Sequence, residues 1–372
     1  MRIACDARAL VGPRTGVGTW TAAIMGGLAR LPGWRVELLA HVPFELPPSF
    51  EGSAAAAVPP PRPPLPGTLW LQWLLPAQLE RLRPDVFVAA LAVAPRRCPV
   101  PSVVMVHDLT PRLRPERHTL KNRFCFNAYL EDSLDGAAAV VVPSEATRHD
   151  VLAVRPRLAG RIHVIGEGAD PRFRPADDPE EARRIRDRYA GGRRYVLHLG
   201  TLEPRKGIPV LVGAWERLAA ADPGAPDLVL AGAPGWGTGP ILARIGRSPF
   251  RERIHLPGYV PDGDLPGLLR SAEAFVLASE AEGYGLPLAE ALCCGVPSVV
   301  SDVPALREVA GGAALLVPPG DPAALAAALR EALEPETSAR LAAAAVARGR
   351  ALRWDGAVAA WRRLLETVAG AA

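Results

Sequence analysis

The chain has 372 residues, of which 49% are hydrophobic and 22% charged, and this globular composition excludes wholesale disorder. Its length fits two domains of about 150–200 residues each. The 43 basic and 39 acidic residues give a formal charge of +4, which permits an anionic ligand, and no basic tract with interleaved aromatic residues points to nucleic acid as a partner.

The sequence carries no signal for membrane insertion or secretion. It has no run of about 18 apolar residues, which a transmembrane helix needs. An acidic residue, Asp6, stands near the start of the chain, where a signal peptide would need an apolar stretch. The 5 cysteines have no Cys-x-x-Cys spacing, so neither a zinc site nor a disulfide framework is expected. We therefore expect a cytoplasmic protein with reduced thiols and no bound metal.

The first half of the chain alternates candidate strands with candidate helices. Apolar runs predict strands at residues 2–7, 35–41, 86–90, 102–106, 138–142 and 162–165. Helical spacing predicts helices at residues 19–31 and 69–82, and the proline-rich residues 43–66 are predicted to form a long exposed loop. The unbroken apolar character of the later strands suits a parallel sheet that is covered on both faces.

A second series of the same kind follows residues 168–175, which carry two prolines and are predicted to link the halves. Strands are expected there at residues 195–199, 228–231, 254–256, 274–277 and 298–300, with a helix at 208–220 and a helical tail from 322. The sequence therefore predicts the α/β class, with two doubly wound Rossmann-like domains, residues 1–170 and 176–353, facing across a cleft.

Residues 200–207 form the first candidate for a phosphate-binding loop. They follow a predicted strand, precede a predicted helix and contain Arg205 and Lys206. Such a loop suits a phosphate, because it offers a guanidinium fork, a compact ammonium and the N–H groups of a helix start. Lys206 is one of 2 lysines in an arginine-rich chain, which favours a specific role, although a solvated loop with two ordinary charges would give the same pattern.

Residues 282–290 form the second candidate. Pro287 suits the first turn of a helix, and the preceding glycines allow a phosphate or sugar to approach the backbone closely. Glu290 stands about one turn into that helix, where its carboxylate can accept hydrogen bonds from two neighbouring hydroxyls, such as a ribose diol. Glu282 lies in the loop, nearer a reacting sugar. A single glutamate would be read as a surface charge, but two that flank such a helix start indicate a site.

Two weaker candidates lie in the first half. His107 stands at the end of an apolar strand, where it could donate a hydrogen bond to a sugar hydroxyl, although a lone histidine is often structural. The loop with Gly16 and Gly18 only loosely resembles a dinucleotide fingerprint, because the acid that would bind a ribose is missing after the second strand. A tight turn alone would explain these glycines.

A basic segment after His107 is a candidate acceptor site. It carries the polar and charged residues Lys121, Asn122, Asn127, Arg112, Arg114, Arg117 and Arg123. Our hypothesis is that this segment meets an anionic acceptor, such as a lipid diphosphate sugar, and that Trp70 and Trp73 aid attachment to a membrane surface. A solvated basic helix and a core-facing tryptophan pair are the alternative.

These motifs resemble glycosyltransferase family 4, the retaining, nucleotide-sugar-dependent enzymes of the GT-B fold class. The likeness extends over nearly the whole chain and is sharpest at residues 200–207, 258–261 and 282–297. His107 with its Asp-Leu-Thr-Pro continuation and residues 144–147 are similar to bacterial mannosyltransferases of that family. Tyr284 departs from the family, since many relatives carry phenylalanine there, and this leaves the detail of that contact open.

The resemblance implies a role for each motif. Arg205 and Lys206 would hold the donor diphosphate, and Glu290 would hold the ribose. Glu282 would hold the transferred sugar, which His107 would contact from the other domain. The expected catalytic residues are therefore His107, Glu282, Arg205 and Lys206. The residues expected to bind the donor are Gly16, Gly18, Gly200, Val260, Gly283, Tyr284, Gly285, Leu286 and Glu290. A C-terminal helix, at about residues 354–372, is implied to pack back on the N-terminal domain.

The implied activity is hexosyl transfer with retention at the anomeric carbon, without a metal or other cofactor. The expected donor is GDP-mannose, and the acceptor a glycan or a polyprenyl-diphosphate-linked sugar in cell-surface polysaccharide synthesis. Peripheral contact with the inner face of the membrane is a further hypothesis. Two alternatives stay open, a GT-B-fold nucleotide-sugar epimerase and a non-catalytic nucleotide-sugar-binding module. An epimerase would need acid and base groups on both faces of the sugar.

Overall fold

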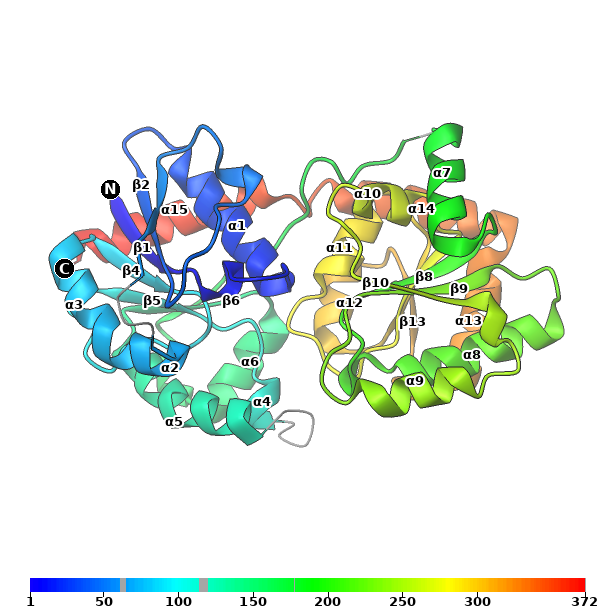
Figure 1. Cartoon of the computed structure of the whole chain (residues 1–372), viewed down its shortest axis with the longest axis horizontal. Helices are drawn as coiled ribbons and strands as arrows, with labels where there is room; N and C mark the ends of the chain where they lie inside the picture. The colour runs from blue at the N-terminus through cyan, green and yellow to red at the C-terminus, as the bar shows by residue number, and fades with distance from the viewer. Residues whose placement is uncertain (61–64, 114–119, 177, 372) are drawn as a thin grey trace. The chain divides into compact units, whose positions relative to one another are not determined.

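The computed structural model describes residues 1–60, 65–113, 120–176 and 178–371, with the backbone alone for residues 111 and 120–126. The chain divides into two units, Met1–Glu167 with Trp354–Ala372 (unit 1) and Gly168–Arg353 (unit 2). Each unit has one parallel sheet with helices packed on it (Figure 1). The predicted α/β class, with two doubly wound sheets, is confirmed.

Unit 1 is built on a seven-stranded parallel sheet in the order β3-β2-β1-β4-β5-β6-β7. Its strands are β1 (Arg2–Asp6), β2 (Arg35–Leu39), β3 (Ala55–Val58), β4 (Val86–Ala89), β5 (Ser102–Met105), β6 (Ala139–Val142) and β7 (Ile162–Val164). Strands β4, β5 and β6 are buried at every position, as the unbroken apolar runs predict. The chain reverses its direction of winding between β1 and β4, and ligands bind at the carboxyl ends of strands at such a point.

The helices of unit 1 include the last helix of the chain. They are α1 (Gly16–Ala29), α2 (Gly67–Leu69), α3 (Leu75–Leu82), α4 (Thr110–Leu113), α5 (Leu120–Gly136), α6 (Glu145–Val154) and α15 (Trp354–Gly370). Helix α15 packs against α1. Its residues Ala357, Trp361 and Leu365 lie on one buried face, and the Trp361 ring meets Trp20 of α1 edge-on with centroids 5.3 Å apart.

Two segments of unit 1 differ from the prediction. The expected loop at residues 43–66 contains β3, whose small alanines pair with β2 as an edge strand that composition alone does not reveal. The expected helix at residues 69–82 is divided into α2, a π-helical turn (Trp70–Leu74) and α3. Pro76 accounts for the division, because a proline has no N–H and its ring collides with the carbonyl four residues before it.

Unit 2 is built on a six-stranded parallel sheet in the order β10-β9-β8-β11-β12-β13. Its strands are β8 (Tyr195–Leu199), β9 (Asp227–Ala231), β10 (Ile254–Gly258), β11 (Ala274–Leu277), β12 (Ser298–Ser301) and β13 (Leu315–Val317). Its helices are α7 (Pro179–Ala190), α8 (Ile208–Ala221), α9 (Thr238–Gly246), α10 (Leu265–Arg270), α11 (Leu286–Cys293), α12 (Pro304–Ala310), α13 (Pro322–Leu333) and α14 (Pro335–Gly349). Here the winding reverses between β8 and β11, so the loops after these two strands lie side by side.

The segment predicted to link the halves, residues 168–175, packs on unit 2. Phe173 and Ala169 are buried, and the Ala169 N–H donates to the Leu352 carbonyl at 2.9 Å. Arg353 donates through Nη1 to the Phe173 carbonyl at 3.0 Å. The segments through which the chain enters and leaves unit 2 are therefore hydrogen-bonded to each other. Composition alone predicts residues 168–175 as a free linker, but the buried side chain of Phe173 holds them on unit 2.

Candidate functional site

The two strongest sequence motifs meet at the carboxyl edge of the sheet in unit 2. Residues 200–207 follow β8, and residues 278–286 follow its neighbour β11. The Glu280 N–H donates to the Arg205 carbonyl at 2.9 Å, which ties the two loops together. Parallel strands that pair in register bring their following loops to one edge, so residues 76 positions apart share one site.

Gly207 makes this approach possible. It has φ +63°, the left-handed region that favours glycine, and it precedes the first residue of α8. A Cβ atom at this position would collide with the carbonyl oxygen of Ala278, which is backbone at the end of β11. The close contact between the two loops therefore excludes any side chain here.

We expect Gly207→Ala to lower the free energy of unfolding by about 3 kcal/mol or more, because backbone strain and a backbone collision add. Chemical denaturation followed by circular dichroism measures this loss. The matched control is Gly239→Ala in α9, where a Cβ atom meets nothing within 4 Å and should cause no loss of stability. Equal midpoints for the two variants would contradict the packing described here.

Glu282 is the centre of a buried ion cluster. Its Oε1 accepts from Lys206 Nζ at 2.6 Å and from Ser279 Oγ at 2.7 Å, and its Oε2 accepts from Arg205 Nη1 at 3.2 Å. Arg205 also pairs through Nε with Glu203 at 2.5 Å. Two cations and two carboxylates thus neutralise one another in a site that is largely closed to solvent.

Charge in this cluster keeps Glu282 ionised although it is buried. Burial would raise the pKa of its carboxyl, but the charges of Lys206 and Arg205 and the hydrogen bonds from Lys206 and Ser279 outweigh burial and lower that pKa to about 2. Burial lowers the pKa of the Lys206 ammonium, although Glu282 opposes the shift. Removing one partner of such a buried pair typically costs about 3–5 kcal/mol.

His198 is a buried residue near Lys206 that the sequence analysis did not single out. It lies fully buried near the end of β8, and its Nδ1 donates to the Val276 carbonyl at 3.1 Å. Burial and the charge of Lys206 lower the pKa of His198 to about 4, so the imidazole is neutral. A polar residue within the apolar run at residues 195–199 was the one signal available. Glu203 and Ser279 were missed too, since polar side chains are common in the loops that follow strands.

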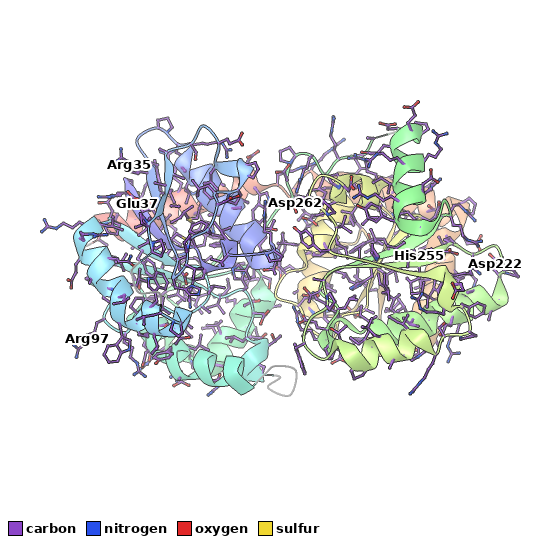
Figure 2. The ribbon with its side chains drawn as sticks, in the orientation of Figure 1. Arg35, Glu37, Arg97, Asp222, His255 and Asp262 are labelled. Carbon is purple, nitrogen blue, oxygen red and sulfur yellow. The ribbon has the colours of Figure 1, made fainter. Side chains whose placement is uncertain are left out.

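Glu290 lies apart from this cluster, one turn into α11. Its side chain is buried, and within the described residues no hydrogen bond reaches its carboxylate. Burial raises the pKa of Glu290 to about 8, with Asp262 and Asp170 adding to the shift and Arg172 opposing it. Arg172 Nη1 donates to the carbonyl of Asp262 (labelled in Figure 2) at 2.9 Å. Glu290 therefore offers a buried carboxyl to hydroxyl groups, and once ionised it accepts hydrogen bonds from two of them.

The start of α11 supplies backbone dipoles to the same region. Gly285 is its N-cap with φ +104°, Leu286 is its first residue, and no side chain caps the helix. Tyr284 is buried beside Gly283. An uncapped helix N-terminus favours an anion.

Two further residues expected to bind the donor lie in other loops of unit 2. Val260, expected near a base, is buried in the loop after β10, while Gly200 directly follows β8.

The candidate residues of unit 1 lie at the carboxyl edge of its own sheet. His107 follows β5, with Nδ1 3.2 Å from Glu167 and Nε2 3.2 Å from the Ala90 carbonyl. Gly16 and Gly18 lie in the first turn of α1, not in a loop before it as expected, because α1 begins at Gly16. A Cβ atom on Gly18 would press on the Ala9 carbonyl, so close packing of the preceding turn explains this glycine.

The acceptor hypothesis falls partly outside the described residues. Arg114 and Arg117 are not described, and of Lys121, Asn122 and Arg123 only the backbone of α5 is. Arg112 pairs with Glu131 at 3.3 Å. The two tryptophans differ, since Trp70 is fully buried and donates to Gln78 at 3.0 Å, whereas Trp73 is 74% exposed. The core-facing alternative is therefore correct for Trp70 and wrong for Trp73.

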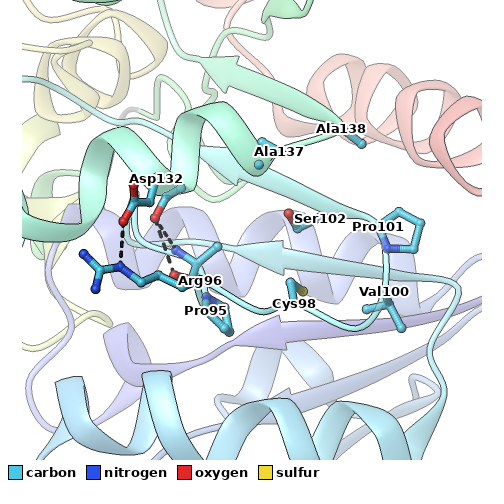
Figure 3. Close-up of a pocket in the computed structure, with 12 residues that line it drawn as sticks. Pro95, Arg96, Cys98, Val100, Pro101, Ser102, Asp132, Ala137 and Ala138 are labelled. Carbon is cyan, nitrogen blue, oxygen red and sulfur yellow. Dashed lines mark hydrogen bonds and ion pairs between the residues drawn. The ribbon is translucent and has the colours of Figure 1, made fainter.

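A cavity elsewhere in unit 1 contains none of the predicted residues. It measures about 210 Å³ and lies at the amino ends of β5 and β6, between Pro101, Ser102 and Ala138 (Figure 3). Arg96 and Asp132 pair at its mouth at 2.6 Å, and burial raises the pKa of the Cys98 thiol to about 11. Ligand sites of this fold lie at the carboxyl ends of the strands. The cavity lies at the amino ends, on the opposite edge of the sheet from such a site.

Neither a metal cluster nor a membrane span is found in the part of the chain that the structure describes. No three or more histidine, cysteine, aspartate and glutamate side chains there are placed to hold a metal ion. No helix there is both long and apolar enough to cross a bilayer.

Comparison with known proteins identifies the family. A family model described as "Glycosyltransferase Family 4" matches residues 14–173, and one described as "Glycosyl transferases group 1" matches residues 193–335. The chain is 32% identical to the O-antigen chain mannosyltransferase B of Escherichia coli over 68% of its own length and 67% of that protein. The chain belongs to glycosyltransferase family 4. The predicted resemblance and enzyme class are thus confirmed.

Other relatives of this glycosyltransferase share part of its sequence or its fold. The serotype-specific mannosyltransferase WbdA of Escherichia coli is 28% identical over 72% of this chain but only 34% of its own length. Anabaena Alr3699/HepE, solved with UDP and glucose, has a TM-score of 0.79 at 21% identity over 98% of this chain and 99% of that one. WaaG, a glycosyltransferase involved in lipopolysaccharide biosynthesis, has a TM-score of 0.78 at 16% identity over 99% of both chains. These likenesses to solved structures show the GT-B fold.

Proposed function

We propose that this glycosyltransferase moves mannose from GDP-mannose, with retention at the anomeric carbon, to a glycan or lipid-linked acceptor in cell-surface polysaccharide synthesis. The observation that carries the donor class is the buried cluster of Arg205, Lys206 and Glu282 at the winding reversal of unit 2. The choice of mannose rests on the names of the sequence relatives, which are mannosyltransferases. Membership of a glycosyltransferase family favours transfer over epimerisation and over a binding-only module.

The cations of the cluster would stabilise the leaving group. Cleavage of the bond between sugar and phosphate places negative charge on the nucleoside diphosphate. Arg205 and Lys206, with the N-terminus of α11, would meet that charge where it develops. The diphosphate would accept the hydrogen bonds from Arg205 and Lys206 that Glu282 accepts in this structure. Glu282 would then accept hydrogen bonds from hydroxyls of the sugar. No metal ion is needed for this role, because the two side chains supply the positive charge.

The remaining contacts would select the nucleoside and admit the acceptor. We assign the ribose diol to Glu290, the base to the backbone near Val260, and the phosphates and sugar to the backbone of Gly200 and of residues 283–286. His107 would contact the sugar, and the turn with Gly16 and Gly18 would lie near the diphosphate or acceptor. The acceptor hydroxyl would attack the anomeric carbon from the face that the leaving phosphate vacates, and its proton would pass to an oxygen of that phosphate. This gives retention without a protein nucleophile.

The reaction is tested with GDP-mannose, UDP-glucose and a set of mannosyl acceptors, with proton NMR of the product. The expected product is an α-mannoside, which retains the configuration of the donor. A β-mannoside would contradict the retaining mechanism. Transfer from UDP-glucose alone would contradict the mannose assignment, and a change at a sugar carbon without transfer would favour an epimerase.

We further propose that the exposed apolar stripe of Leu69 and Trp73 contacts an anionic membrane that carries the acceptor. Both side chains are exposed at i, i+4 spacing. Gln72, between them, bonds the backbone of Ala94 and Arg96, and Arg97 of the same loop is exposed (Figure 2). An amphipathic tryptophan beside arginines suits the interface of an anionic bilayer.

We expect Trp73→Ser to reduce sedimentation with phosphatidylglycerol vesicles at least threefold, because the largest exposed apolar group of the stripe is lost. Binding of the unaltered protein should weaken as salt rises. Leu242→Ser, an exposed apolar residue of unit 2, is the matched control and should bind as the unaltered protein does. Equal sedimentation of all three proteins would contradict this membrane contact.

A further inference from the structure

Both ring nitrogens of His107 face hydrogen-bond acceptors. Nδ1 lies 3.2 Å from Oε1 of Glu167, and Nε2 lies 3.2 Å from the carbonyl oxygen of Ala90. A carbonyl oxygen and a carboxylate only accept, and a neutral imidazole carries a single N–H. The doubly protonated imidazolium is the form that donates to both partners at once, with Glu167 as its counter-ion.

The surroundings of this pair support the charged form. The side chain of Glu167 is 5% exposed and that of His107 17% exposed. A carboxylate this deeply buried is costly unless it is paired and hydrogen-bonded. The indole of Trp20 meets the imidazole edge-on, with centroids 5.1 Å apart and planes at 83°. The end of β4, helix α1 and the segment before unit 2 therefore fix the ring from three sides.

We propose that Glu167 is a positioning residue that holds His107 as an imidazolium, so that His107 presents a fixed positive charge to the substrate and does not act as a general base. An imidazolium has no free lone pair on either nitrogen, so it cannot take a proton from an acceptor hydroxyl. Its positive charge can stabilise negative charge that develops on a nearby sugar or phosphate oxygen. The part played by His107 in turnover rests on the proposed function, whereas its charge in the resting protein does not.

Nitrogen NMR of the full chain labelled with ¹⁵N-histidine tests the charge directly, at pH 7 and without any substrate. The sequence has 7 histidines, and His107→Gln assigns the signal of His107 by its loss. We expect both ring nitrogens of His107 to carry protons in the unaltered protein and only one to do so in Glu167→Gln. A neutral His107 ring in the unaltered protein would overturn the proposal whether or not the enzyme turns over GDP-mannose.

A kinetic cycle with GDP-mannose tests the positioning role. Glu167→Gln keeps an acceptor for Nδ1 but removes the charge, and we expect kcat to fall about tenfold with KM for GDP-mannose changed less than twofold. In a His107→Gln background the same substitution should change kcat less than twofold, because Glu167 acts through His107. Equal losses in both backgrounds would show that Glu167 acts elsewhere.

Two controls separate this proposal from a general loss of structure and from failure of the proposed function. Glu366→Gln removes an exposed carboxylate of α15 that pairs with Arg362, and kcat should not change. A melting temperature of Glu167→Gln within a few degrees of the unaltered protein shows that unit 1 stays folded. If the unaltered protein turns over neither GDP-mannose nor UDP-glucose, the proposed function fails, and the NMR result still decides the charge of His107.

Discussion

Lys206→Met is expected to lower kcat by about 100- to 1000-fold, the loss typical of removing one group that stabilises a developing oxyanion. The substitution keeps the apolar stem of the side chain and deletes the ammonium that lies 2.6 Å from Glu282. Steady-state turnover of GDP-mannose measures the effect. Because the chemical step depends on charge in the leaving diphosphate, kcat should fall more than KM rises.

Two further variants keep this prediction testable if Lys206→Met is unstable. The double variant Lys206→Met with Glu282→Gln removes both charges of the buried pair, which typically restores stability. Arg340→Met removes an exposed cation of α14 and should leave turnover unchanged. A folded Lys206→Met protein with the turnover of the unaltered enzyme would contradict the role of Lys206 in holding the leaving group.

At pH 9, where the carboxyl of Glu290 is mostly ionised, Glu290→Gln is expected to raise the KM for the nucleotide sugar at least tenfold with little change in kcat, because the ribose lies away from the reacting bond. An amide presents one oxygen, whereas the carboxylate of Glu290 accepts from two hydroxyls. Glu331→Gln, an exposed carboxylate of α13, is the control and should leave KM unchanged. An unchanged KM in Glu290→Gln would show that the ribose binds elsewhere.

The raised pKa of Glu290, about 8, also predicts how binding depends on pH. Below pH 8 the carboxyl is mostly protonated, and above pH 8 it is mostly ionised and accepts two hydroxyl donors. Affinity for GDP should therefore rise about tenfold from pH 7 to pH 9, as the ionised fraction increases about tenfold. Calorimetry at a series of pH values measures this, and the dependence should be absent in Glu290→Gln. An equal dependence of GDP affinity on pH in both proteins would show that the group that titrates belongs to the nucleotide and not to Glu290.

The regular elements could be predicted where side chains alone decide them. Strands β8 and β11 have the predicted bounds, because each is an unbroken apolar run that both faces of a sheet bury. Strands β3 and β13 were missed, since β3 is made of small residues and β13 has three residues of which two are not fully buried. Each of these strands forms because the neighbouring strand offers unpaired backbone N–H and C=O groups. The local pattern of side chains carries no information about that neighbour.

The individual residues of the site could be predicted from the sequence, but the contacts between them could not. Arg205, Lys206 and Glu282 each stood out through residue type and place after a strand. That Glu282 binds both cations follows from the pairing of β8 with β11, which depends on the topology of the whole unit. The contact between His107 and Glu167 spans 60 positions and likewise had no signal beyond a glutamate between two glycines.

Binding of nucleoside diphosphates to the unaltered enzyme and to Lys206→Met tests whether the cluster in unit 2 is the diphosphate site. Isothermal calorimetry with GDP, UDP, ADP and dTDP, with and without EDTA, names the nucleotide and needs no acceptor. We expect one diphosphate, GDP, to bind the unaltered enzyme tightly, EDTA to leave this binding unchanged, and Lys206→Met to bind GDP at least tenfold more weakly. If none of the four binds, or if Lys206→Met binds as the unaltered enzyme does, the cluster in unit 2 is not the diphosphate site.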